Sequence, residues 1–241
     1  MRYAIISDIH GNLQALETVL NRINQENVDK IVCLGDVVGY NANPNECSDI
    51  IRTQGFPTIC GNHDAVACGM DEPWGFNPIA LSAALWTREQ LSADNTEWLN
   101  GLPDVRKIGP FLAVHGSPAG RNPYMFSWED ILPHLPFVEE HGSRLCFFGH
   151  THSPGIFSTD GVYSVDDNGR FDLGTEKLFF INPGSVGQPR DGDPRASFGL
   201  YDTDKNQFEL VRIMYPIKEA ADAVVEAGLP NFLAERLFLG R

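Results

Sequence analysis

Residues 3–12 read YAIISDIHGN, an apolar run that ends in an Asp-x-His pair, and this stretch decides the fold. A short apolar run bounded by polar or turn-forming residues is typical of a buried strand. Residues 31–36, IVCLGD, repeat the arrangement. Between the two runs, apolar residues recur at every third or fourth position of 12–25, which predicts a helix. A strand, a crossover helix and a second strand form a unit with parallel strands.

The same pattern recurs along the first two thirds of the chain. Further strands are expected at 57–60, 111–114 and 145–148, and each is followed at once by polar residues. Asn43-Pro44 favours the start of a helix that reaches about Thr53. The polar residues therefore gather at the carboxyl ends of the strands, which is where open α/β sheets bind ligands.

The rest of the chain predicts more helices and then hairpins. Helices are expected at 77–91 and 93–99, inside a helical insertion at about 69–101 that covers one side of the site. The later strands are expected at 155–163, 178–181, 197–202 and 207–214, before a helix at 217–227. No Pro/Gly/Ser-rich linker divides the sequence, so we expect a single domain over residues 1–241.

Composition narrows the class of function. The formal net charge is −14, which argues against broad contact with nucleic-acid backbones or anionic membrane. No apolar run is long enough for a signal peptide or a membrane span. The five cysteines form no CxxC pair. We therefore expect a cytoplasmic protein that acts on a small ligand, without a nucleic-acid polymer or a membrane as partner. The oligomeric state stays open.

Five of the seven histidines directly follow predicted strands. Four of them, together with two carboxylates and one amide, form a set of seven candidate metal ligands: Asp8, His10, Asp36, Asn62, His115, His150 and His152. Nitrogen and oxygen donors without a thiolate suit manganese, iron or zinc better than a structural zinc site. Two ions that share Asp36 would use all seven donors. Two divalent ions also outweigh the two carboxylates, so the site would attract phosphate.

Five short motifs carry a family resemblance. Residues 8–12 (DIHGN), 35–39 (GDVVG), 61–64 (GNHD), 114–116 (VHG) and 149–152 (GHTH) resemble the motifs of the calcineurin-like metallophosphoesterases. The later NPGSVGQPR at 182–190 and EAGLP at 226–230 resemble a prokaryotic branch of that superfamily, often labelled phosphodiesterase or diadenosine-polyphosphatase-like. The resemblance covers nearly the whole chain.

The resemblance implies an α/β fold with four αββα layers, in which two mixed sheets are flanked by helices. It implies two divalent transition-metal ions, manganese or iron first, with zinc, nickel or cobalt as alternatives. It further implies that a hydroxide bridging the metals attacks phosphorus, with Asp36 as the shared ligand. His63 is implied to protonate the leaving oxygen. The expected substrates are small phosphodiesters, phosphomonoesters or nucleotide polyphosphates.

The sequence departs from the protein Ser/Thr phosphatases of this superfamily at two positions. Gly39 and Cys60 stand where those enzymes carry an Asp and an Arg. Protein phosphatase activity is therefore a less favoured alternative, and a scaffold without catalysis is another, although every ligand position is filled. Asp64 either orients His63 or caps the turn.

Three residues are candidates for substrate binding, namely Asn12, Arg121 and Arg190. Arg190 lies beside Asp191 and Asp193, so it is either a phosphate ligand or an ordinary surface charge. Arg121, Asn122 and Tyr124 follow the strand that ends at His115 closely enough to line the pocket. The sequence leaves these alternatives open.

Overall fold

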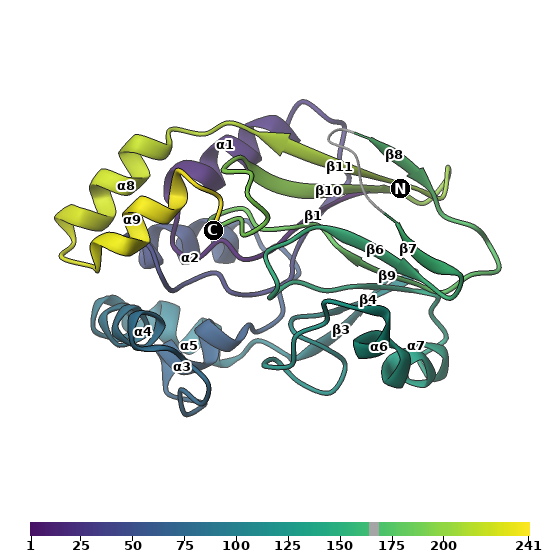
Figure 1. Cartoon of the computed structure of the whole chain (residues 1–241), viewed down its shortest axis with the longest axis horizontal. Coiled ribbons are helices and arrows are strands. Elements are labelled where there is room, and N and C mark those ends of the chain that lie inside the picture. Colours follow the sequence, from purple (N-terminus) through teal and green to yellow (C-terminus); the bar gives the residue numbers. More distant parts are fainter. Residues whose placement is uncertain (164–168) are drawn as a thin grey trace.

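Two β-sheets packed face to face form the centre of the molecule, and helices cover both outer faces (Figure 1). The computed structural model describes residues 1–163 and 169–241. One sheet has the strand order β2-β1-β10-β11-β8, and the other has the order β3-β4-β5-β9-β6-β7. Both sheets contain parallel and antiparallel pairs. The predicted four-layer αββα sandwich is therefore confirmed.

Strands and helices alternate at the start of the chain, whereas the strands β5–β11 follow one another without a helix between them in the described residues. The strands are β1 (Arg2–Ile6), β2 (Lys30–Cys33), β3 (Val105–Ile108), β4 (Phe111–Val114), β5 (Leu145–Phe147), β6 (Gly155–Ser158), β7 (Gly161–Tyr163), β8 (Arg170–Asp172), β9 (Phe179–Asn182), β10 (Ala196–Asp202) and β11 (Gln207–Ile213). The helices are α1 (Leu13–Ile23), α2 (Pro44–Thr53), α3 (Asn62–Cys68), α4 (Pro78–Gln90), α5 (Ala93–Asn100), α6 (Trp128–Ile131), the 3-10 helix η1 (Leu132–His134), α7 (Leu135–Glu140), α8 (Ile217–Glu226) and α9 (Asn231–Leu237).

The alternation of side chains along β1 explains the layering. Tyr3 and Ile5 point into the core between the two sheets. Ala4 and Ile6 point the other way, into the core beneath α1 and α8. All four are buried, because successive residues of a strand face opposite sides of the sheet and both sides are covered. A third core lies between the second sheet and the helices α6 and α7.

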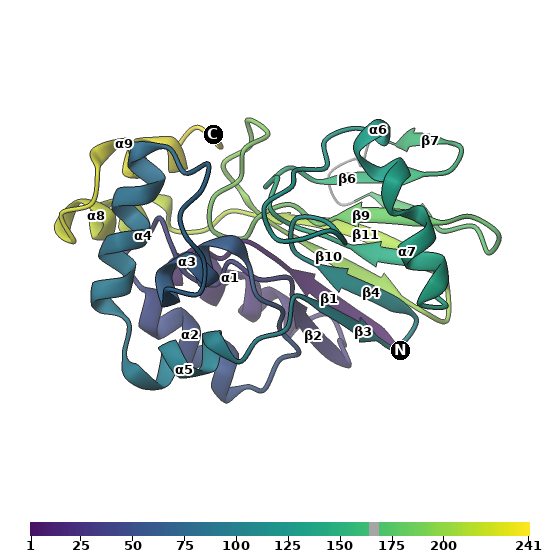
Figure 2. The ribbon, with the colours of Figure 1, turned by 90° about the horizontal axis from the view of Figure 1, so that it is seen from below.

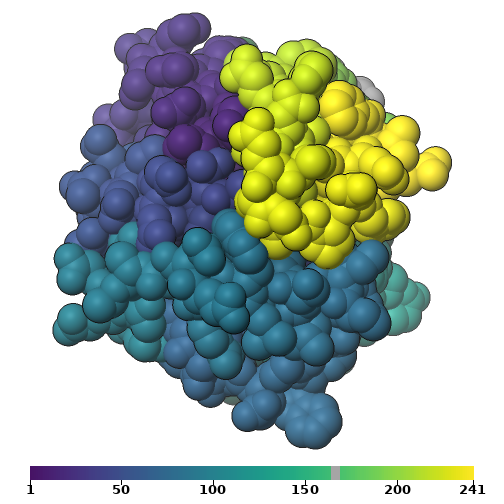
Figure 3. Space-filling model, turned by 90° about the vertical axis from the view of Figure 1, so that its left-hand side faces the viewer, coloured from purple at the N-terminus to yellow at the C-terminus, as the bar shows by residue number. Residues whose placement is uncertain are grey.

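The C-terminal helices close one end of the molecule. In Figure 3, α8 and α9 (yellow) lie against α1 (purple) on one side and against the segment that contains α4 (blue) on the other. The sequence predicted α8, but the short helix α9 was not expected.

The segment 57–60 differs from its prediction. It is not a strand, and only an isolated parallel bridge joins Cys33 to Thr58. The reason is that the Cys60 amide donates to the carbonyl oxygen of Pro103 instead of to β2, and Gly61 then begins α3. The strands β3 and β8 were also not predicted.

Residues 69–101 lie beside the strand ends with α2 and α3 (Figure 2). Asn45 of α2 accepts a hydrogen bond from the Ser92 amide at 2.8 Å and donates one to the carbonyl oxygen of Gln90 at 2.8 Å. Arg88 of α4 donates to the carbonyl oxygens of Val66 and Ala67. These bonds fix α4 and α5 to the body of the protein. No helix in the described part of the chain is long and apolar enough to cross a membrane.

Candidate metal centre and the adjoining cavity

Five of the seven predicted metal ligands have a left-handed backbone conformation. The φ angles are between 51° and 65° at Asp8, His10, Asp36, His150 and His152. Non-glycine residues adopt this conformation rarely and at a cost of about 1–3 kcal/mol each, and such residues cluster at functional sites. Each of the five lies in the turn that follows β1, β2 or β5. The strain therefore marks the loops that aim these side chains at one point.

The ligand atoms form two adjoining groups. Asp8, His10, Asp36 and His152 each place a ligand atom within 4.8 Å of the others, and Asp36, His115 and His150 do the same. Asp36 belongs to both groups. Asn62 joins the second group, because its Oδ1 lies 3.1 Å from Nε2 of His115. All seven predicted ligands are therefore brought together and buried.

The hydrogen bonds of the imidazoles show that this site suits cations. Nδ1 of His10 faces the Val38 carbonyl oxygen at 3.1 Å, and Nδ1 of His152 faces the Gln188 carbonyl oxygen at 2.6 Å. A carbonyl oxygen only accepts, so both Nδ1 atoms are donors and both Nε2 atoms carry lone pairs in the neutral rings. Those two Nε2 atoms face each other at 3.0 Å. A cation between them removes the repulsion of the lone pairs.

The second group has the same character. Nδ1 of His115 faces the Leu34 carbonyl oxygen at 2.8 Å, which again directs the lone pair of Nε2 to the site. Oδ2 of Asp36 is buried 3.2 Å from that Nε2, and it loses this hydrogen-bond partner when His115 gives up its proton. His150 differs, because its Nε2 faces the Asn122 carbonyl oxygen at 3.0 Å and leaves Nδ1 as the basic atom. A buried carboxylate oxygen without a partner is costly unless it binds an ion.

In the metal-free site, burial and neighbouring charged side chains shift the pKa values of the candidate ligands. Burial opposes ionisation of Asp36, but the positive charge and the hydrogen bond of His115 outweigh it and hold the pKa of Asp36 below the usual value. Burial lowers the pKa of His115, but the Asp36 carboxylate raises it more strongly. The resulting pKa of His115 is about 9. Burial lowers the pKa of His10 and His152, so these rings stay neutral, as metal ligands must be.

His63 lies beside the ligands. Its backbone N–H donates to Oδ1 of Asp36 at 2.8 Å, while its imidazole packs between the rings of Tyr40 and Phe76, with centroid distances of 4.3 and 4.6 Å. Nδ1 of His63 is buried without a partner. Asp64 does not contact this ring, because its carboxylate accepts from the amides of Gly61 and Val38 at 3.0 and 3.1 Å. Of the two roles expected for Asp64, the structure shows the cap.

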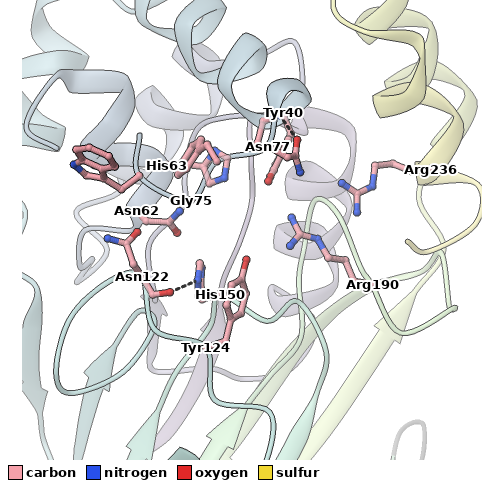
Figure 4. A pocket seen from close by; sticks show the side chains of 13 residues that line it. Tyr40, Asn62, His63, Gly75, Asn77, Asn122, Tyr124, His150, Arg190 and Arg236 are labelled. Carbon is pink, nitrogen blue, oxygen red and sulfur yellow. Dashed lines mark hydrogen bonds between the residues drawn. The ribbon is translucent and has the colours of Figure 1, made fainter. Parts of the chain in front are cut away.

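A cavity opens beside the metal ligands and is shown in Figure 4. Its walls come from distant parts of the chain, including the segment 74–77, the loop that carries Asn122 and Tyr124, and helix α9. The Tyr124 ring stacks on His150 with a centroid distance of 4.0 Å. His63 and Asn62 face the cavity, so a ligand in it reaches the metal centre directly.

The three predicted substrate residues lie in different surroundings. Arg190 lines the cavity. Arg121 does not line it and forms ion pairs with Asp71 and Asp104. The side chain of Asn12 accepts from the Ala15 amide at 3.1 Å as the cap of α1 and donates to the Gly187 carbonyl oxygen at 2.9 Å. Neither Asn12 nor Arg121 offers a free group to a substrate here.

Seven residues of the cavity wall were not singled out from the sequence, namely Tyr40, Trp74, Gly75, Phe76, Asn77, Ala80 and Arg236. Five of these lie in the segment 69–101, which was expected to cover one side of the site. Tyr40 carries one local signal, since it directly follows the GDVVG motif. It also has a left-handed φ of 58°. Nothing local in the sequence marks Arg236, because it reaches the site only through the packing of α9.

Three comparisons with known proteins agree on the family. A protein of Methanocaldococcus jannaschii, MJ0912, is 41% identical over an alignment of 243 positions, which covers 99% of this chain and 98% of the relative. The phosphodiesterase YfcE of Escherichia coli is 26% identical over 207 residues, 85% of this chain and 89% of its own. The crystal structure of a metallophosphoesterase from Sphaerobacter thermophilus superposes with a TM-score of 0.89 at 37% identity, over 100% of this chain and 99% of that one.

The family model matches the part of the chain that holds every candidate metal ligand. Residues 1–206 match the calcineurin-like phosphoesterase superfamily domain. The match includes every strand of both sheets except β11, and it stops before helices α8 and α9. With the fold, the full set of ligand positions and this match in agreement, the chain belongs to the calcineurin-like phosphoesterase superfamily.

Proposed function

We propose that this protein is a dinuclear-metal phosphoesterase that hydrolyses small phosphodiesters, phosphomonoesters or nucleotide polyphosphates. The observation that carries the proposal is the pair of buried ligand groups joined at Asp36. One ion would be held by Asp8, His10, Asp36 and His152, and the other by Asp36, Asn62, His115 and His150. The phosphodiesterase YfcE, a relative over most of the chain, supports this class of reaction.

The chain supplies oxygen and nitrogen donors, so the expected ions are manganese or iron, with zinc, nickel or cobalt as alternatives. When bound, two such ions withdraw charge from the phosphoryl oxygens and supply the nucleophile for an in-line displacement. The protein contributes the orientation. The carbonyl oxygens of Val38, Leu34 and Gln188 fix the rings of His10, His115 and His152, so the site needs little reorganisation.

His63 is the proposed general acid. It faces the cavity, and Tyr40 and Phe76 hold its ring without using Nδ1. Burial, only partly opposed by the Asp36 carboxylate, lowers the pKa of His63 to about 4 in the metal-free protein, which is below the ideal for an acid at neutral pH. A bound phosphate anion beside the ring favours the protonated form and so raises this pKa. Substrate binding would therefore protonate His63, which could then donate its proton to the leaving oxygen.

The cavity favours a small substrate. Its walls, on three separate parts of the fold, enclose the entrance to the metal centre. The net charge of −14 adds repulsion for a long polyanion. We therefore propose a small phosphorylated substrate and a cytoplasmic location, and no nucleic-acid polymer or membrane as partner.

Metal content and turnover test the proposal together. Protein purified without added metal should contain about two transition-metal ions per chain and hydrolyse bis(4-nitrophenyl) phosphate until a chelator is added. The Asp36→Ala variant should lose both ions, whereas His10→Ala should weaken one site first. An Asp36→Ala protein that keeps one ion at full occupancy and normal turnover would remove the shared-ligand assignment. A wild-type protein that binds metal and hydrolyses no phosphoester would instead support the scaffold alternative.

A further inference from the structure

Two arginines share one wall of the cavity. Arg190 lies in the loop between β9 and β10, and Arg236 lies in α9, 46 positions later along the chain. Figure 4 shows their side chains next to each other and directed into the cavity. Both guanidinium groups lie over the ring of Tyr40, with distances of 5.4 and 5.9 Å from their carbon atoms to the ring centroid. Two like charges are thus held close together by separate elements.

Neither arginine is neutralised by an acidic side chain. In residues 1–163 and 169–241, no carboxylate side chain lies within 4.0 Å of either guanidinium, although the protein has 32 acidic residues. Arg190 donates to Oε1 of Gln188 at 3.0 Å, and its Nε is buried without a partner. Arg236 donates through Nε to the main-chain oxygen of Arg241, and its two terminal nitrogens have no partner in the described residues.

Other arginines of this protein have acidic partners. Arg212 and Arg121 both pair with aspartates. Burial and the charge of Arg190 lower the pKa of Arg236 to about 10, so it stays charged at neutral pH at an energetic disadvantage. An anion between the two guanidinium groups removes that disadvantage.

The arginine pair lies next to the metal ligands without belonging to them. The Tyr40 ring that contacts both arginines also contacts the rings of His10 and His63, with centroid distances of 4.7 and 4.3 Å. A single substrate can therefore place one group at the metal ligands and another at the arginines. Guanidinium groups bind phosphate through paired N–H donors, and two cations match the charge of a phosphate dianion.

We infer that Arg190 and Arg236, supported by Tyr40, bind a second phosphate group of the substrate while the phosphoester to be cleaved lies at the metal centre. This inference rests on the proposed function and makes its substrate class narrower. The preferred substrates carry two phosphate groups, as nucleoside diphosphates, nucleotide polyphosphates and bisphosphorylated metabolites do.

Non-hydrolysable phosphonates test the inference without relying on turnover. Calorimetric titration of the metal-loaded protein compares each alkylphosphonate with the α,ω-bisphosphonate of the same chain length, from one to four methylene groups. The wild-type protein should bind the best bisphosphonate at least about tenfold more tightly than its monophosphonate, because charge-assisted hydrogen bonds are worth about this much each. Arg236→Gln and Arg190→Gln should each remove most of this advantage, and Arg236→Lys should keep part of it.

The Lys218→Gln variant is the matched control. It removes one positive charge from the neighbouring helix α8, where Lys218 is exposed and pairs with Asp222, and it should keep the full advantage of the bisphosphonate. Metal content is measured for every variant, so that lost metal is not mistaken for a lost subsite.

Three outcomes would overturn the inference. The wild-type protein could show no advantage for any bisphosphonate, or the Gln variants could keep the advantage, in which case the metals alone account for it. The Gln variants could also lose monophosphonate binding by the same factor, in which case the arginines contact the phosphate at the metals. If instead the wild-type protein hydrolyses no ester but still prefers bisphosphonates in an arginine-dependent way, the proposed function fails and the subsite stands.

Discussion

Gly39 and His63 are packed so closely that position 39 has no room for a side chain. A Cβ atom at Gly39 would lie 2.7 Å from Nδ1 of His63 and 3.1 Å from its Cβ and Cγ atoms. The φ angle of Gly39 is +100°, which side chains also rarely adopt. Position 39 is where protein phosphatases of this superfamily carry the Asp that pairs with the catalytic His. In this chain the imidazole occupies that space and is held by aromatic rings instead.

The Gly39→Ala variant should therefore displace His63. We expect both metal ions to remain and kcat to fall by at least about tenfold, because a general acid contributes about 10²–10⁴-fold when correctly placed. The control is Gly55→Ala, since Gly55 also has a positive φ of 66° but no atom within 4 Å of the added methyl group. Gly55→Ala should lose about 1–2 kcal/mol of stability in denaturant titrations, Gly39→Ala should lose more because of the clash with His63, and only Gly39→Ala should lose turnover. Equal turnover in the two variants would contradict the close packing.

The second prediction concerns the leaving group. His63→Gln should keep both metals, lose modest activity on nitrophenyl esters and lose far more on alkyl or nucleoside esters, because a nitrophenolate leaves without a proton and an alkoxide does not. A series of esters with increasing leaving-group pKa measures this, and the lost transition-state stabilisation should grow along the series. A uniform loss would indicate that His63 positions the phosphate. Loss of metal would make it a ligand.

The third prediction concerns the segment 69–101, which we expect to shape substrate choice without contributing ligands. Replacement of the whole segment by a linker would expose the core, because Ala83 and Leu99 in it are fully buried. A sharper change is Trp74→Ala, because Trp74 lines the cavity yet 82% of its surface is exposed. The ranking of a substrate panel should change, while metal content and melting temperature stay as they are.

Leu85→Ala is the control for that variant. Leu85 is also an exposed apolar residue, in α4 of the same segment, and it does not line the cavity. Its substrate ranking should match that of the wild-type protein. If Trp74→Ala lowered turnover by the same factor on every substrate, this segment would affect the catalytic step and not the selectivity between substrates.

The fourth prediction follows from the pKa of His115, which is about 9 in the metal-free protein. Below that pH the ring carries a proton that metal must displace, so metal affinity should rise with pH and level off above about 9. Burial first of all raises the pKa of Asp8 to about 6, so affinity should fall more steeply below pH 6. Calorimetry at pH 7.5 in two buffers of different ionisation enthalpy measures the released proton. Affinity that is constant between pH 7 and 9 would contradict the prediction.

Local sequence was sufficient for the parts of the site that depend on strand ends. Asp8 and His10 follow β1, and His150 and His152 follow β5, so their gathering at strand ends could be anticipated from apolar runs and turns. The apolar runs indicated the edge of one sheet, whereas β1 and β5 belong to different sheets. Arg236 could not be anticipated, because α9 is a short helix whose position depends on packing against α8. The sequence also did not predict the hydrogen bonds of Asn12 and Arg121 to Gly187 and Asp71, because these partners lie far away along the chain.

The left-handed backbone at the metal ligands has a consequence for how this lineage can change. Glycine would suit these five turns better than histidine or aspartate, although histidine and aspartate adopt this conformation more readily than most side chains. Selection for activity therefore works against selection for stability at each of these positions. A related protein that no longer needs catalysis should accept glycine or asparagine at these positions. Without metal, it should be more stable than the present protein without metal. Sequences that keep all five ligands in such turns have been held there by their chemistry.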